Sequence, residues 1–548
     1  MTRLKLLALF VAAASLPAAA QSQTVTIGQG KLAGEALADG TGVFRGIPYA
    51  KAPVGELRWK PPVAAEAWQG TRDATKFGPA CMQLRATPGT DSVYAEDIPA
   101  MSEDCLSLNV WAPKGAKKAP VMVWIHGGGL AGGSNSSAFY DAKNIAARGV
   151  IVVSINYRLG LFGFLSHPGL SAESSHGSSG NYGLLDQIEA LKWVQQNAAA
   201  FGGDPSNVTI FGESAGGLSV MDLMASPLAR GLFDKAIAQS AYMVTNPDLK
   251  KPAYGAPSGE QIGQFAASLL KAPDVAALRA IDAETLNAAG PKIGFFPQPV
   301  VDGWVLTKQV VDTFDAGEQA RVPMIAGFNA GEIRTLRRLA PPIPADAAAY
   351  EKAIRDNYGD LAEAFLKLYP SSDVEENVLA ATRDGIYGWT AQRMAEKQTA
   401  AGAPAFLYYF EHSYPAADAL KIPAFHAIEI PYIFGQAGTD AEMPKSWPRA
   451  PVNAEEAALS DALLGYWTSF AKTGQPSAKG AAAWAAYGPT RAYVAFRAKP
   501  VAATGVLPGS YALHEEVVCR RRAANQAWMA NIGVAAGTIP TAPCQAKR

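Results

Sequence analysis

The stretch FGESAGG, residues 211–217, places a serine between Gly212 and Gly216, directly after the β-branched run at 208–210. A strand that turns at once into a helix passes through a strained corner, and glycines on both sides let neighbouring backbone approach without a Cβ clash. The corner pushes the serine outward, to a helix N-terminus whose free N–H groups favour negative charge. Ser214 is therefore predicted to be a nucleophile, although a glycine-rich turn of this kind can also be purely structural.

The segments around this turn alternate between strand and helix patterns. Two runs dense in β-branched residues, VMVWIH at 121–126 and VIVVSINY at 150–157, are typical of central strands buried on both faces. The alternation predicts an α/β fold with a mostly parallel sheet flanked by helices. Residues 247–299 show no clear period and are expected to form an insertion or cap that shapes the pocket. Further strands are predicted at 208–211, 235–239, 323–327 and 406–410, and helices around 184–194 and 455–472.

A second glycine-rich segment, HGGGLAGG at 126–133, directly follows one of these strands. Three consecutive glycines contribute no side chain to packing and cost backbone entropy, so their use lies in exposed amide hydrogens. The amides of Gly128, Gly129 and Ala215 are predicted to form an oxyanion hole, each donor being worth roughly 100- to 1,000-fold in rate. A phosphate-binding turn is the alternative, but neither GxGxxG nor GxxxxGK[ST] is present.

A serine nucleophile needs a base, and the chain has six histidines. His426, in PAFHAIEIPYIFG, follows the serine, as the chain order serine, acid, histidine requires, although a lone histidine is more often structural. The acid is then expected between the two, and Glu332 ends the segment GFNAGE that follows the apolar run VPMIA. Asp302 is the competing carboxylate. Glu213, beside the serine, is expected to be a charged neighbour rather than a participant.

The composition bounds the class of protein. The 548 residues are 49% hydrophobic and 18% charged, which is ordinary globular usage. Lys plus Arg and Asp plus Glu both number 48, so the formal net charge is zero and supplies no field to attract nucleic acid. Length alone suggests roughly three or four domains, but the spread of the motifs favours a single domain over 21–548. Nothing in the sequence indicates an oligomeric state.

Residues 1–20 are predicted to be a signal peptide. A basic start with Arg3 and Lys5 precedes an apolar stretch too short to span a bilayer, and the alanines at 18–20 offer a small-residue cleavage site. No later apolar run of about 18 residues suggests a membrane span. The mature protein is expected to be soluble and exported, either secreted or periplasmic.

Export makes the four cysteines informative. In an oxidising compartment Cys81, Cys105, Cys519 and Cys544 can form two bridges in three connectivities, of which the two sequence-local pairs are the simplest. Free buried thiols are the alternative. No CxxC or His-rich cluster is present, so no metal site is expected.

These motifs together resemble the type-B carboxylesterases, an α/β-hydrolase family that includes the cholinesterases. The resemblance runs through almost the whole chain after residue 20 and implies the α/β-hydrolase fold. It is carried by FRGIPYAKAPVGELRWKPP (44–62), EDCLSLNVWAP (103–113), HGGG (126–129), INYRLGLFGFL (155–165), GNYGLLDQ (180–187) and FGGDPSNVTIFGESAGG (201–217).

The resemblance implies roles for particular residues. It assigns the nucleophile to Ser214, the acid to Glu332 and the base to His426, and it keeps the three oxyanion donors named above. The implied reaction is hydrolysis of a small-molecule carboxylic ester through an acyl-enzyme, with neither metal nor organic cofactor. A bridge between Cys81 and Cys105 is also implied, whereas the C-terminal pair matches less securely.

Two departures from the family pattern bear on the substrate. The stretch between the first two cysteines has no tryptophan, where cholinesterases place their choline-binding residue, so choline esters are not expected. After Glu332 the chain reads IRTLRRL, and Arg334, Arg337 and Arg338 are candidate substrate-binding residues for an ester whose acid carries further carboxylates. In this respect the chain resembles a fumonisin-type esterase, an enzyme that removes tricarballylate side chains. The alternative is a solvated helix face, given the spacing of three and four.

A non-catalytic binding protein is the alternative of another class, because neuroligin-like relatives use the same fold for adhesion. Those relatives lose the nucleophile, whereas the serine, glutamate, histidine and glycine loop are all present here. A peptidase or amidase would use the same triad, and the sequence leaves that reaction open.

Overall fold

The computed structural model describes residues 21–548 except 86–91, 99, 529–531, 543 and 545–548, so the predicted signal peptide lies outside the described residues. One large sheet runs through the described part of the chain, in the order β1-β2-β3-β7-β9-β8-β10-β11-β12-β13-β14-β15, with β4 beside β2. A separate pair joins β5 and β6. The strands are β1 (Gln21–Ile27), β2 (Gly30–Ala36), β3 (Gly42–Pro48), β4 (Thr71–Asp73), β5 (Ala80–Cys81), β6 (Met101–Ser102), β7 (Ser107–Ala112), β8 (Ala119–Ile125), β9 (Ile151–Ile155), β10 (Gly203–Glu213), β11 (Lys235–Gln239), β12 (Met324–Asn329), β13 (Ala405–Phe410), β14 (Ala492–Phe496) and β15 (Pro500–Thr504).

The centre of the sheet is parallel and its edges are antiparallel. Strands β9, β8, β10, β11, β12, β13 and β14 pair in parallel, which confirms the predicted mostly parallel sheet. The edges β1-β2-β3-β7-β9 and β14-β15 pair antiparallel and were not predicted. Edge strands such as β2 (GKLAGEA) and β15 (PVAAT) are rich in Gly and Ala, which weakens the strand signal.

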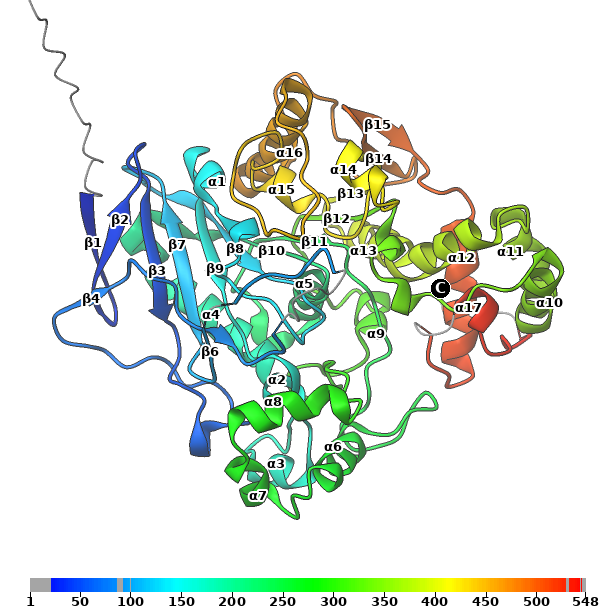
Figure 1. The fold of residues 1–548 in the computed structure, drawn as a ribbon, viewed down its shortest axis with the longest axis horizontal. Helices are drawn as coiled ribbons and strands as arrows, with labels where there is room; N and C mark the ends of the chain where they lie inside the picture. The colour runs from blue at the N-terminus through cyan, green and yellow to red at the C-terminus, as the bar shows by residue number, and fades with distance from the viewer. Residues whose placement is uncertain (1–20, 86–91, 99, 529–531, 543, 545–548) are drawn as a thin grey trace, which may run out of the picture.

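Both faces of the central strands are buried. In β8, Val121, Val123 and Ile125 belong to one hydrophobic cluster, whereas Met122 and Trp124 belong to the other. Successive side chains of a strand point to opposite faces, so an unbroken apolar strand needs cover on both sides. Residues of α4 and α5 complete the first cluster and residues of α16 the second, and Figure 1 shows helices on both sides of the sheet.

Helices fill the connections between the strands. The stretch 247–299, expected as an insertion or cap, carries α6, α7 and α8. A single π-helical turn, η8 (Asp384–Gly388), joins α12 to α13, and two 3-10 turns, η5 (Glu332–Arg334) and η6 (Arg337–Leu339), follow β12. The α-helices are α1 (Lys143–Ala147), α2 (Gly160–Phe164), α3 (Pro168–Glu173), α4 (Tyr182–Asn197), α5 (Ala215–Ala225), α6 (Gly259–Leu269), α7 (Val275–Ala280), α8 (Ala283–Lys292), α9 (Val310–Asp315), α10 (Ala347–Tyr358), α11 (Ala362–Leu368), α12 (Val374–Arg383), α13 (Trp389–Ala400), α14 (Pro415–Ala419), α15 (Ile430–Ile433), α16 (Ala454–Thr473) and α17 (Ser510–Ala523).

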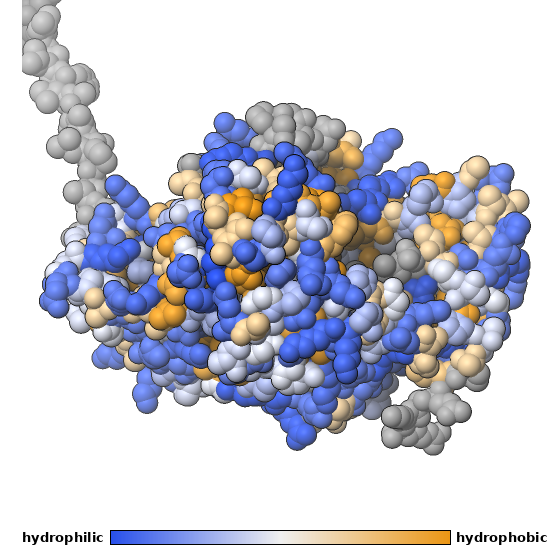
Figure 2. Space-filling model, turned by 90° about the horizontal axis from the view of Figure 1, so that it is seen from below, coloured by the Kyte–Doolittle hydropathy of each residue, from blue (hydrophilic) through white to orange (hydrophobic). Residues whose placement is uncertain are grey.

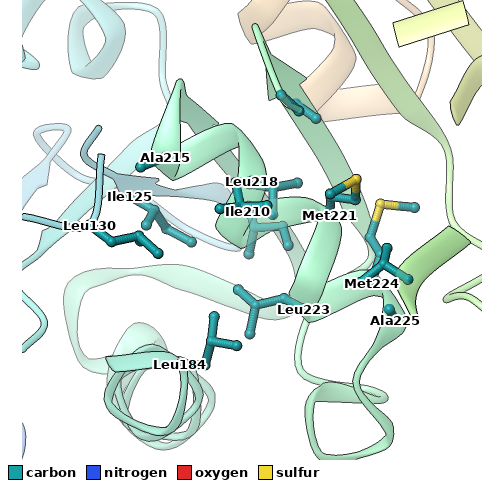
Figure 3. Close-up of a cluster of buried hydrophobic side chains, with 14 of the residues drawn as sticks. Ile125, Leu130, Leu184, Ile210, Ala215, Leu218, Met221, Leu223, Met224 and Ala225 are labelled. Carbon is teal, nitrogen blue, oxygen red and sulfur yellow. The ribbon is translucent and has the colours of Figure 1, made fainter. Parts of the chain in front are cut away.

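Helix α5 packs against the central strands of the sheet. Figure 3 shows Leu218 and Leu223 of this helix among side chains that include Ile210 of β10 and Leu184 of α4. All of its residues are buried. Because β10 and α5 are both held in the core, the turn that joins them has a defined position.

The surface is mixed in character. Seen from below in Figure 2, hydrophilic side chains cover most of the face, and apolar residues form smaller patches between them. Among the described residues, no helix combines the length and apolar character needed to cross a membrane.

Candidate active site

Ser214 occupies the turn between β10 and α5. Its backbone angles, φ of 58° and ψ of −121°, lie in a region that residues other than glycine rarely adopt. Glycine is required on both sides of it, because a Cβ at Gly212 would lie 2.7 Å from the carbonyl oxygen of Ile125, and a Cβ at Gly216 would lie 2.0 Å from the same atom. Ser214 is partly exposed although its neighbours from Phe211 to Gly217 are otherwise buried.

His426 and Glu332 meet beside this turn. Nδ1 of His426 and Oε2 of Glu332 are hydrogen-bonded, although the two residues are 94 positions apart in the sequence. Oε1 of Glu332 accepts further bonds from the hydroxyl of Ser240 at 2.6 Å and from the amide of Asn329 at 2.8 Å. The carboxylate is fully buried, so these contacts hold its orientation.

The competing carboxylate is used elsewhere. Oδ2 of Asp302 accepts from the hydroxyl of Ser178 at 2.6 Å, and Oδ1 accepts from the amides of residues 304–306. Asp302 therefore caps its own loop, and the structure brings Glu332, not Asp302, to the histidine.

Two further buried glutamates face the imidazole. Nε2 of His426 lies 3.1 Å from Oε1 of Glu213, and neither atom has a hydrogen-bond partner among the described residues. Glu429 is fully buried and accepts from Asn329 at 2.6 Å and from Gln239 at 3.3 Å. The sequence analysis did not single out Glu429, although it stands three residues after His426.

This crowding of carboxylates shifts the proton equilibria of the site. Burial raises the pKa of Glu213 to about 8, with His426 opposing the rise. Burial disfavours the imidazolium of His426, but the charges of Glu213 and Glu332 outweigh it and raise the pKa of His426 to about 9. Burial also raises the pKa of Glu429. Glu213, His426 and Glu429 therefore bind their protons more tightly than the isolated side chains do.

Two tyrosines pack against the same imidazole, and sequence reasoning missed both. The ring of Tyr387, from η8, lies 5.4 Å from that of His426 between centroids, and the ring of Tyr94 lies edge-on at 6.4 Å. Tyr387 is in turn edge-on to Tyr242 at 6.1 Å. Neither residue has a sequence signal, because both come from segments far along the chain from the histidine.

The glycine loop after β8 presents free amides. Gly128 and Gly129 have φ values of 108° and 63°, which only glycine adopts readily. Among the described residues, neither amide donates a recorded hydrogen bond, and that of Ala215 is the first of helix α5, which has no partner within its own helix. The neighbouring His126 is stacked on Tyr157 at 4.5 Å, and burial lowers its pKa to about 4.

The three arginines after Glu332 differ from one another. Arg334 pairs with Glu376 at 2.7 Å, and Arg337 pairs with Glu375 at 2.7 Å on the exposed start of α12. Arg338 is exposed, and no ion pair or hydrogen bond is recorded for it among the described residues. Within the described ranges, the cluster therefore consists of two paired arginines and one exposed arginine without a counter-ion.

Both expected disulfides are present. Cys81 joins Cys105, and Cys519 joins Cys544, which confirms the sequence-local connectivity. In the described part of the chain, no group of three or more His, Cys, Asp or Glu side chains is arranged to hold a metal ion.

Known proteins share this architecture. Residues 21–507 match the family model described as the carboxylesterase family. A fumonisin B1 esterase from Sphingopyxis macrogoltabida is 36% identical over 481 residues, covering 85% of each chain. The para-nitrobenzyl esterase of Bacillus subtilis (strain 168) is 37% identical over 471 residues, covering 85% of this chain and 92% of its own. A solved structure of a PNB esterase superimposes with a TM-score of 0.77 at 33% identity, covering 90% of this chain and 99% of its own.

The mostly parallel sheet flanked by helices is thus the α/β-hydrolase fold, and the chain belongs to the carboxylesterase family and is a carboxylic-ester hydrolase.

Proposed function

We propose that Ser214, His426 and Glu332 form the catalytic triad of this esterase. The observation that carries the proposal is the hydrogen bond between His426 Nδ1 and the buried Glu332, beside a serine on a strained strand-to-helix turn. Glu332 holds the imidazole with its Nδ1–H committed, so that Nε2 is the nitrogen left to exchange a proton.

The reaction proceeds in two halves. Nε2 of His426 takes the proton of the Ser214 hydroxyl as its oxygen attacks the ester carbonyl, and the resulting imidazolium returns that proton to the departing alcohol. Water then attacks the acyl-serine, giving a proton to the same nitrogen, and the acid leaves as the serine regains its hydrogen. The amides of Gly128, Gly129 and Ala215 are proposed to stabilise the oxyanion of both tetrahedral intermediates.

Removing the hydroxyl tests the nucleophile. Ser214→Ala is expected to reduce hydrolysis of p-nitrophenyl butyrate by at least about 1,000-fold while the protein stays folded. Ser219→Ala, on the same buried helix, is the matched control and is expected to keep activity. Wild-type turnover in the Ser214 variant would overturn the assignment.

We also propose that Arg338 binds an anionic group on the acyl side of the substrate. Arg334 and Arg337 have glutamate counter-ions, whereas Arg338 is exposed and has none among the described residues. Burial raises the pKa of Tyr242, and Arg338 opposes that rise while Glu213 adds to it, so Arg338 and Glu213 act on the same phenol. The ring of Tyr242 also contacts that of Tyr387, which contacts the imidazole of the proposed base His426. The similarity to a fumonisin B1 esterase supports a substrate of this class, an ester of a polycarboxylic acid such as tricarballylate.

A comparison of paired substrates tests this preference. Arg338→Gln is expected to lower kcat/KM for a tricarballylate monoester by about 10- to 100-fold, the loss typical of one hydrogen bond to a charged group, and to leave p-nitrophenyl butyrate unaffected. Arg337→Gln, which removes a paired arginine, is the control and is expected to leave both substrates unchanged. An equal loss on the neutral and anionic esters would refute the role of Arg338.

We further propose that residues 21–548 form one exported domain. A single sheet that takes strands from Gln21 to Thr504 supports the one-domain assignment, and two disulfides support an oxidising compartment, secreted or periplasmic. Fractionation of the native host, with detection of a chain that begins near residue 21, tests the export.

A further inference from the structure

The described segment 92–98 of the loop closed by Cys81 and Cys105 lies against the proposed base. Its Tyr94 hydroxyl donates to the carbonyl oxygen of His426 at 2.7 Å and lies 2.6 Å from Oγ1 of Thr335. A phenol has one hydrogen, and here the carbonyl receives it, so Thr335 is the donor in the second bond. Burial raises the pKa of Tyr94, which keeps the phenol protonated at neutral pH.

Thr335 follows Glu332 by three residues, so one phenol connects two otherwise separate segments. The imidazole comes from the segment before α15, and its carboxylate partner comes from η5 after β12. The bond between His426 and Glu332 spans 94 residues, and the Tyr94 hydroxyl supplies a second link between the same two segments.

The segment is itself held from outside the site. The single hydroxyl hydrogen of Ser446 has two carbonyl acceptors within reach, Ala95 at 2.7 Å and Val93 at 3.1 Å, and a carboxylate oxygen of Glu96 accepts from the amide of Ala138 at 3.1 Å. The ring of Tyr94 also packs 6.1 Å from that of Trp447. Tyr94 therefore reaches the site from a backbone with its own supports.

The same disulfide-closed loop contacts the glycine loop. The side-chain amide of Gln83 donates to the carbonyl of Gly133 at 2.7 Å, and its oxygen accepts from the Gly133 amide at 2.8 Å. One covalently closed loop thus contacts the segment of the proposed oxyanion donors at Gly133 and the acid–base pair at Tyr94.

We propose that Tyr94 is a positioning residue that holds the His426 and Glu332 segments in register, and that the Cys81–Cys105 loop carries it. This inference rests on the proposed triad. Tyr94 takes no proton in the reaction; it acts through the backbone of the histidine and through Thr335.

Tyr94→Phe keeps the ring and removes the hydroxyl. It is expected to lower kcat by about 3- to 10-fold, the range for one neutral hydrogen bond, with KM unchanged. It is also expected to move the acid limb of kcat/KM to lower pH, because a looser Glu332 raises the pKa of His426 less. Among the described residues, five charged or titratable groups face the imidazole: Glu213 at the end of β10, Glu332, Glu429, and the phenols of Tyr94 and Tyr387. The pH shift is assigned to Tyr94 only when the other four side chains are unchanged.

Two further variants separate positioning from general destabilisation. Tyr350→Phe removes a similar buried bond, from a phenol on α10 to the carbonyl of Tyr369 at 2.8 Å, and is expected to leave the acid limb in place because Tyr350 is not among the groups that act on the imidazole. Thr335→Val is expected to act in the same direction as Tyr94→Phe and to add nothing to it in the double variant.

Ser214→Ala is assayed in the same series, so that failure of the triad assignment is seen separately. If that variant is inactive and Tyr94→Phe keeps both kcat and the wild-type acid limb, the positioning role is wrong and the triad stands. A lower kcat with an unmoved acid limb, matched by Tyr350→Phe at equal folded fraction, would equally overturn the proposal.

Discussion

Replacing Glu213 with glutamine is expected to extend activity to lower pH. Oε1 of Glu213 lies 3.1 Å from Nε2 of His426. Among the neighbouring carboxylates, Glu213 contributes most to raising the pKa of His426. At this separation two unit charges interact by about 1.3 kcal/mol at the permittivity of water and about 5 kcal/mol at an effective permittivity of 20. The first figure corresponds to about one pKa unit.

The upper figure is too large for this site. The pKa of His426 rises from 6.5 to about 9 in total, and Glu332 and Glu429 contribute to that rise while burial opposes it. A fall of about one to two pKa units on removing the Glu213 charge is therefore consistent with the structure. Because His426 as the proposed base must be neutral to accept a proton from Ser214, activity is expected to fall as pH falls through the pKa of His426, and a lower pKa moves this acid limb to lower pH.

The assay is kcat/KM for p-nitrophenyl butyrate, a neutral ester whose own charge does not change, measured from about pH 5 to about pH 10.5 so that the range passes above the pKa of His426. Glu375→Gln, which removes an exposed carboxylate paired with Arg337, is the control and is expected to leave the limb in place. An acid limb that stays put or moves to higher pH in Glu213→Gln would refute the electrostatic reasoning, whatever the change in maximal rate.

Two other variants test the packing beneath the site. Gly216→Ala is expected to lower both kcat and the unfolding temperature, because its Cβ would lie 2.0 Å from the Ile125 carbonyl oxygen, whereas Gly488→Ala, with open space around its Cβ, is expected to be neutral in an activity and thermal-melt comparison. Asp222→Asn is expected to stabilise the protein at pH 7 by on the order of 1 to 4 kcal/mol, because burial raises the pKa of Asp222 and neither carboxyl oxygen has a partner among the described residues. A carboxyl whose pKa is raised on folding destabilises the folded state as pH rises above the pKa of the unfolded chain, near 4. The stabilisation by Asp222→Asn, measured by urea titration, should therefore shrink as the pH is lowered toward 4. A stabilisation that is independent of pH would contradict this cause.

Local backbone demands were readable from the sequence. The turn at Ser214 needs glycines at 212 and 216, and the glycine loop has positive φ values that favour glycine. Both segments can therefore be recognised from a few adjacent residues of the sequence. The central strands were equally clear, because burial on both faces requires an unbroken apolar run, and β11 was predicted at its observed bounds. Family resemblance then assigned Glu332 as the acid, for which Asp302 was the competing carboxylate, and His426 as the base, for which a structural role was the alternative.

Other features depend on contacts between distant parts of the chain. The antiparallel edges of the sheet follow from pairing with a neighbour rather than from their own Gly- and Ala-rich sequences. Arg334, Arg337 and Arg338 look alike in IRTLRRL, and only the position of α12 gives the first two a counter-ion, whereas the third has none within the described part of the chain.

By itself, therefore, the sequence determined the central strands, the glycine-flanked turn at Ser214 and the fold family, because these depend on residues next to one another. The tertiary structure decided which groups surround the imidazole: Glu213 at Nε2, Glu332 at Nδ1, and the rings of Tyr94 and Tyr387. They come from four segments whose only common property is that the packed sheet and its helices bring them to one point, and their combined charge and burial set the proton affinity on which the reaction depends.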